Sequence, residues 1–118
     1  MRQLQAAVAL HNQGELDQAE VIYRSVLAVD DNNFYALRFL GCLCRMKGLY
    51  IEGIKLLRKA VSLRPSDADC LCNLGNTLAD SGSHQEAILV LEDCLGLCDD
   101  FAKINLFRQP SGGGALLD

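Results

Sequence analysis

Apolar residues recur at helical spacing along most of the chain, and short polar turns separate the helical stretches. Leu37, Leu40 and Cys44, for example, fall at positions i, i+3 and i+7 and so share one face of a helix. Gly48 interrupts this pattern, since glycine tolerates the positive φ at which many helices end. The pattern predicts seven helices and no strand, with the helices near residues 2–13, 16–28, 34–46, 50–63, 68–80, 84–97 and 101–107.

The helical stretches repeat at a fixed interval of 34 residues. Gly14, Gly48 and Gly82 are separated by this interval, and each follows the first of two predicted helices. Chance does not produce many such coincidences in one register, so the chain is built from three similar helix pairs. The same interval relates Leu10, Cys44 and Leu78; Ala19, Gly53 and Ala87; and Tyr23, Leu57 and Leu91.

The turns and crossings of the second unit have a clear physical basis. Pro65 lacks an N–H and disfavours helix at Arg64, so the second helix is expected to end there. Asp67 then caps the next helix. Gly41 and Gly75 are expected where paired helices come closest, because a larger side chain would push the axes apart.

This pattern resembles the tetratricopeptide repeat. The matching motifs are Leu37-x2-Leu40-Gly41-x2-Cys44, Gly53-x3-Leu57 and Pro65 in one unit, and Leu71-x2-Leu74-Gly75-x2-Leu78 and Ala87-x3-Leu91 in the next. The resemblance implies an all-α fold, a right-handed superhelical array of three antiparallel helix pairs with a short C-terminal helix. The expected domain covers residues 1–107, with units 1–33, 34–67 and 68–101 and a partial unit 102–107. Residues 108–118, which include three consecutive glycines, are expected to form a flexible tail or linker.

Composition and charge narrow the classes of function. The net charge is −4 and no run of Lys or Arg occurs, so we expect no nucleic-acid partner. No apolar run approaches the ~18 residues that span a bilayer, and the N-terminus lacks a signal-peptide cleavage site, so we expect no membrane contact. We expect a soluble, cytoplasmic protein.

The sequence contains no recognisable catalytic or cofactor motif. His11 and His84 stand in no Ser/His/Asp or Cys/His arrangement, and no phosphate-binding glycine loop is present. We therefore expect a protein that is not an enzyme and has no cofactor.

Six cysteines are many for a chain of this length. Four of them form two C-x-C pairs inside predicted helices, where side chains two residues apart point in different directions and cannot chelate a metal as a C-x-x-C turn does. We expect six free thiols and no metal site, with Cys44 and Cys94 as small apolar core residues. The six are Cys42, Cys44, Cys70, Cys72, Cys94 and Cys98.

The family resemblance implies that the first helix of each pair lines a concave face. Large apolar residues beside arginines on that face suit peptide recognition, although curvature of the array also offers a way to bury some of them between units. Asn73 and Asn76 resemble one rung of the asparagine ladder in O-linked N-acetylglucosamine transferases. The cationic clamp of chaperone adaptors is absent when it is laid over units one to three, and it is only partly matched when its positions are shifted by one unit. The candidate peptide-binding residues are Tyr35, Arg38, Phe39, Cys42, Arg45, Asn73, Asn76 and Lys103.

Three functions remain open from the sequence. The first is an interaction module that binds a protein or peptide on its concave face. The second is the N-terminal, substrate-recruiting array of a larger transferase. The third is a scaffold that forms a homo-oligomer through its C-terminal pair, because the last full helix carries more apolar residues than one stripe can bury. Those residues are Ile88, Leu89, Val90, Leu91, Leu95 and Leu97.

Overall fold

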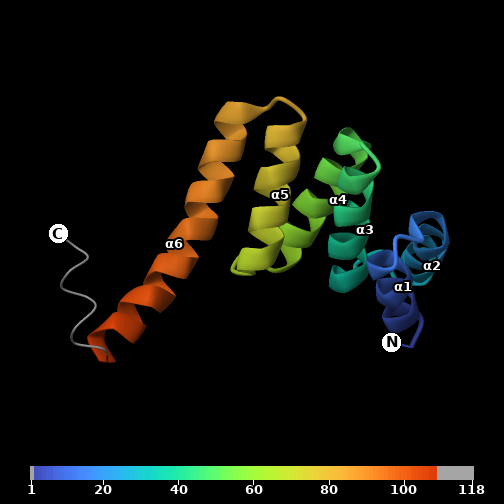
Figure 1. The fold of residues 1–118 in the computed structure, drawn as a ribbon, viewed down its shortest axis with the longest axis horizontal. Helices are drawn as coiled ribbons and strands as arrows, with labels where there is room; N and C mark the ends of the chain where they lie inside the picture. The colour runs from blue at the N-terminus through green and yellow to red at the C-terminus, as the bar shows by residue number, and fades with distance from the viewer. Residues whose placement is uncertain (1, 109–118) are drawn as a thin grey trace.

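The computed structural model describes the backbone of residues 2–108 and the side-chain surroundings of residues 2–97. Within residues 2–108 it contains six helices and no strand, arranged as three antiparallel pairs that stack side by side (Figure 1). The all-α array expected from the repeat is confirmed. The helices are α1 (Arg2–Asn12), α2 (Leu16–Val29), α3 (Phe34–Met46), α4 (Tyr50–Leu63), α5 (Ala68–Asp80) and α6 (His84–Arg108).

Each pair turns at a glycine with positive φ, as the sequence pattern predicts. Gly14, Gly48 and Gly82 have φ values of +86°, +79° and +95°. The residue after each glycine donates its N–H to a carbonyl five residues earlier, as from Leu49 to Cys44 at 2.7 Å. This bond satisfies a carbonyl that the ending helix leaves without a partner.

The connections between pairs are fixed by caps on the following helix. The side chain of Asn33 accepts a hydrogen bond from the N–H of Ala36, and that of Asp67 accepts one from Cys70. The predicted cap at Asp67 is therefore confirmed. These caps determine where α3 and α5 begin.

The first helices of the pairs lie closer together than the second helices. The backbone of α3 contacts those of both α1 and α5, whereas no such contact joins α2 to α4 or α4 to α6 in the described part of the chain. An array whose first helices approach more closely must curve toward them. The concave side is thus formed by α1, α3 and α5.

The predicted separate helix over residues 101–107 is wrong. These residues are helical, but they continue α6, which runs without a break to Arg108. Asp99 occupies the position at which Pro65 follows the end of α4, and an aspartate keeps the N–H that a continuing helix needs. The tail predicted over 108–118 lies, except for Arg108, outside the described residues.

The prediction of six free thiols is also wrong. Cys72 on α5 and Cys94 on α6 form a disulfide, with their Cα atoms 5.8 Å apart. The two residues lie on adjacent antiparallel helices, a relation that spacing within either helix does not reveal. Cys98 lies outside the residues whose side chains are described.

The other described cysteines, Cys42, Cys44 and Cys70, are free. Burial raises the pKa of Cys44 to about 11 and that of Cys70 to about 12, and it raises the pKa of Cys42 as well. All three therefore remain protonated thiols near neutral pH.

No helix in the described part of the chain combines the length and apolarity needed to cross a bilayer.

Substitution of Gly75 by leucine is expected to destabilise the protein by about 2 kcal/mol, because overpacking separates α5 from α6. A Cβ at this position would lie 2.6 Å from Cγ of Leu91. Gly96 is the matched control, since it is also helical but a Cβ there meets no atom within 4 Å. Urea unfolding midpoints of Gly75→Leu and Gly96→Leu test this, and equal midpoints would contradict it.

Reduction of the Cys72–Cys94 disulfide is expected to lower the free energy of unfolding by about 3 kcal/mol. The bond closes a loop with a sequence separation of 22 residues, and opening it restores entropy to the unfolded chain. The measurement is urea unfolding with and without a reductant. The Cys72→Ala/Cys94→Ala variant should not respond to reductant, and an equally unresponsive parent would refute the expectation.

Candidate functional site

An apolar hollow opens between α1 and α3 on the concave side. Its volume is about 400 Å³. Among the described lining residues, Gln5 is the one amide, and the other side chains are aliphatic or aromatic. This composition suits an apolar group of a ligand that is held by a small number of polar contacts. The lining residues are Leu4, Gln5, Val8, Tyr35 and Phe39.

One wall of the hollow is the outer end of an aromatic stack. The ring of buried Tyr23 lies 6.1 Å from that of Phe39, and the ring of Phe39 lies 6.4 Å from that of Tyr35, with interplanar angles of 22° and 25°. Tyr23 is fully buried, whereas Tyr35 is 39% exposed. The stack therefore joins the core to the hollow and holds its wall in place.

The buried end of this stack is held by His11. Its Nδ1 lies 3.1 Å from the hydroxyl of Tyr23, and its Nε2 lies 3.1 Å from the sulfur of Met46. Burial lowers the pKa of His11 and raises that of Tyr23 to about 12. Both side chains are thus neutral near pH 7, and their contact positions the stack without a charge.

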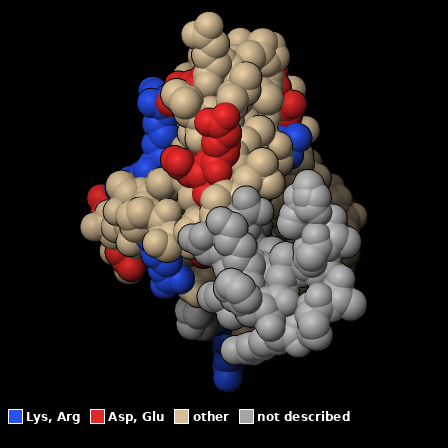
Figure 2. Space-filling model, turned by 90° about the vertical axis from the view of Figure 1, so that its left-hand side faces the viewer, with Lys and Arg blue, Asp and Glu red and all other residues tan. Residues whose placement is uncertain are grey.

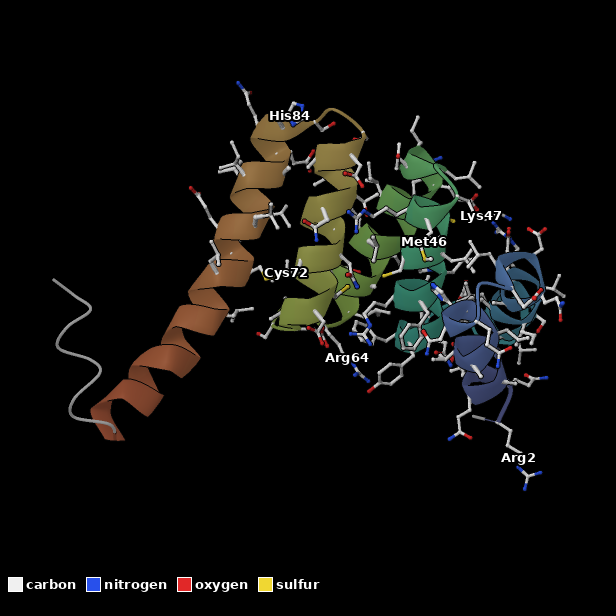
Figure 3. The ribbon with its side chains drawn as sticks, viewed as in Figure 1. Arg2, Met46, Lys47, Arg64, Cys72 and His84 are labelled. Carbon is white, nitrogen blue, oxygen red and sulfur yellow. A yellow bond between two sulfur atoms is a disulfide. The ribbon has the colours of Figure 1, made fainter. Side chains whose placement is uncertain are left out.

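Arg64 covers the exposed end of the stack from the connection between α4 and α5 (Figure 3). Its guanidinium carbon lies 4.3 Å from the centroid of Phe34 and 4.8 Å from that of Tyr35. One N–H of Arg64 also donates to the Tyr35 hydroxyl at 3.0 Å. Two aromatic contacts and a hydrogen bond therefore orient this exposed arginine.

Arg38 lies beside the same rings in a different charge environment. Its guanidinium is 4.8 Å from the centroid of Phe39, and its side chain is only 16% exposed. Asp67 and Asp69 lie 3.8 and 3.6 Å from it, so its charge is balanced within the chain. Its Nε is buried and has no hydrogen-bond partner among the described residues.

Four of the remaining sequence-derived candidates, Cys42, Arg45, Asn73 and Asn76, are not among the residues that line the hollow. Arg45 pairs with Asp80 at 2.6 Å, and Cys42 is partly buried. Asn73 and Asn76 are partly buried on α5, one helix away from the hollow. Lys103 lies on α6, where its side chain is not described. Of the eight candidates, Tyr35 and Phe39 line the hollow, and Arg38 adjoins it.

Sequence reasoning does not find Arg64, because only the first helix of each pair is expected to line the concave face. The signal that points to Arg64 is its position directly before Pro65. A residue before proline favours an extended backbone, so Arg64 leaves the helix there. Its aromatic partners, Phe34 and Tyr35, lie about one repeat earlier in the chain. The described residues contain no group of three potential metal ligands.

The fold and this inner face can be compared with known proteins. A family model described as "Tetratricopeptide repeat" matches residues 68–98. The helix pairs, their positive-φ glycine turns and the curvature toward the first helices agree with this match. The chain belongs to the tetratricopeptide-repeat family. A comparison of the sequence with curated proteins finds no match.

Several solved structures share the tetratricopeptide-repeat fold. A mutant O-GlcNAc transferase of Thermobaculum terrenum is 34% identical, with a TM-score of 0.80, over 85% of this chain and 19% of that protein. The second repeat domain of Spaghetti, solved with an HSP90 peptide, is 20% identical with a TM-score of 0.77, over 81% of this chain and 89% of that one. MamA is 19% identical with a TM-score of 0.77, over 86% of this chain and 59% of MamA. The last two show similarity of fold alone, and this chain spans about a fifth of the transferase.

Proposed function

We propose that this repeat array is a protein-interaction module that binds a peptide or protein segment on its concave face. The observation that carries the proposal is the apolar hollow between α1 and α3, with its aromatic wall. An open apolar hollow with a rigid aromatic side and arginines nearby is typical of a surface that anchors a partner side chain. The module itself needs no catalytic group.

The fold comparison supports this proposal in general terms. The Spaghetti repeat domain, which shares the fold, was solved with a bound peptide. Arg38, Asn73 and Asn76 extend the proposed surface from the hollow toward α5. Asn73 and Asn76 keep the proposed role of amide groups that bind the backbone of an extended peptide.

Filling the hollow is expected to abolish partner binding. Val8→Arg places a long charged side chain among the lining residues, whereas Val21→Arg makes the same change at a position that is 69% exposed on α2. Proteins captured by the parent should be lost with Val8→Arg and retained with Val21→Arg, as judged by mass spectrometry. An Arg38→Ala/Asn73→Ala variant should weaken the same captures.

The outcome that would contradict the proposal is equal capture by the parent and by Val8→Arg. Thermal unfolding of each variant, followed by circular dichroism, is the control for folding. A loss of binding counts only if Val8→Arg unfolds at a temperature similar to that of Val21→Arg.

A second proposal is that this array recruits substrates for a larger transferase. The similarity to the O-GlcNAc transferase of Thermobaculum terrenum supports it, because it extends over most of this chain. The test is the mass of the natural protein, detected in its cells with an antibody raised against this chain. A natural protein of about the size of this chain would contradict the second proposal and leave the first intact.

We also propose that the array self-associates through the outer face of α6. The 34-residue register makes Ile88 and Leu95 the counterparts of Ile54 and Val61 on α4. Ile54 and Val61 are partly buried against the core, whereas Ile88 and Leu95 are 56% and 61% exposed. In Figure 2, viewed from the α6 side, the described part of the surface is mostly uncharged, with acidic side chains near its middle and basic side chains toward its edges. Apolar residues without a covering helix mark a contact surface.

The average mass from light scattering is therefore expected to rise over a tenfold range of protein concentration. Ile88→Glu/Leu95→Glu should hold the mass at that of one chain, because it places charge on the contact face. Val21→Glu/Val29→Glu, at two exposed positions on α2, is the matched control and should behave as the parent. A constant monomer mass for the parent would exclude self-association.

A further inference from the structure

We infer that the partner segment carries both an apolar side chain, which fills the hollow, and a carboxylate, which binds Arg64. This inference rests on the proposed peptide-binding function and specifies the chemistry of the ligand. Three observations support it. Arg64 has no acidic partner among the described residues, its guanidinium is held in a fixed orientation, and it lies close to the hollow.

Arg64 differs from most of the described basic side chains in having no acidic partner among residues 2–97. Among residues 2–97, only Arg2, Lys55 and Arg64 have no carboxylate within 4 Å, and the guanidinium of Arg64 contacts Tyr35, which lines the hollow. Arg38, the other arginine near the hollow, already faces Asp67 and Asp69. The positive charge available at this site is therefore that of Arg64. The basic residues with acidic partners are Arg24, Arg38, Arg45, Lys47, Arg58 and Lys59.

The orientation of Arg64 is already set before a ligand arrives. Phe34 and Tyr35 contact its guanidinium, and the Tyr35 hydroxyl accepts one of its N–H groups. A guanidinium has five N–H donors, so the remaining ones are available to an external acceptor. A carboxylate matches this planar set of donors through two parallel hydrogen bonds. Because the arginine is held in place, little side-chain entropy is lost on binding.

The hollow and Arg64 are separated by a single aromatic ring. Tyr35 lines the hollow and also lies 4.8 Å from the Arg64 guanidinium, and the next ring inward, Phe39, is 6.4 Å further. An extended peptide advances roughly 3.3 Å per residue. A side chain in the hollow and a carboxylate on Arg64 are thus two or three positions apart in an extended partner. Among the described residues that line the hollow there is no carboxylate to repel such a ligand.

The test uses short fluorescein-labelled peptides of serine, alanine and threonine that contain one phenylalanine. Two or three positions away, each peptide carries glutamate, glutamine or lysine. Binding to the full chain is measured by fluorescence anisotropy. We expect the glutamate peptide to bind roughly tenfold more tightly than the glutamine peptide, and the lysine peptide to bind most weakly. Replacing its phenylalanine by alanine should abolish binding.

Variants of the protein assign this preference to Arg64. Arg64→Gln should make the glutamate and glutamine peptides equivalent, and Arg64→Glu should favour the lysine peptide. Arg58→Gln is the matched control, because Arg58 is also an exposed arginine but pairs with Glu86 on α6. It should leave the preference for glutamate unchanged.

The outcomes separate this inference from the proposed function. If peptides bind and Val8→Arg abolishes binding, but glutamate confers no advantage or Arg64→Gln retains it, the inference is wrong and the proposed function stands. If no peptide binds, or Val8→Arg binds every peptide as the parent does, the proposed peptide site itself is wrong.

Discussion

The close approach of the two helices within a pair is the constraint on which the array depends. A Cβ on Gly41 would lie 2.5 Å from Cγ of Leu57, and one on Gly75 would lie 2.6 Å from Cγ of Leu91. In each case the leucine of the second helix occupies the space that the glycine leaves. This contact fixes the distance between the axes of a pair, and the spacing of successive pairs follows from it. The geometry of the concave face is therefore set in the core.

The first unit replaces this glycine–leucine contact, and the replacement creates the candidate site. The 34-residue register places Ala7 opposite Tyr23, where later units have glycine and leucine. Both residues are fully buried, so the first pair accommodates an aromatic ring in its core. That ring stacks on Phe39 of the next unit, and the stack continues to Tyr35 at the hollow. A change in one core contact thus reaches the surface through three rings.

The features that sequence reasoning predicted are those set within one repeat. Helix limits at Gly14, Gly48 and Pro65 follow from local backbone chemistry, and Tyr35 and Phe39 follow from their place on a first helix. The disulfide between Cys72 and Cys94 and the contact of Arg64 with Tyr35 each join residues on different elements. Their distances depend on how neighbouring helices pack, which the period of the chain does not specify. The continuous α6 does not follow from the pattern, because Asp99 at the repeat position of Pro65 permits a helix to continue but does not require it.

Charge pairs between units show how the α6 end differs from an interface inside the array. Arg24 pairs with Glu52 at 2.8 Å, and one repeat later Arg58 pairs with Glu86 at 2.7 Å, so the same bridge joins successive second helices. The register then places Glu92 where an arginine would continue the series, and Gln18 at the position of Glu52 and Glu86 in the first unit. A second copy stacked in the repeat register would therefore form no such pair.

Because exposed ion pairs of this kind contribute only about 0–1 kcal/mol, their loss does not prevent association. The affinity of a contact through α6 must instead come from burying Ile88 and Leu95, at roughly 25 cal/mol per Å² of apolar surface. The proposed contact through α6 is expected to persist at high salt, whereas the proposed binding of a carboxylate by the exposed Arg64 is expected to weaken there.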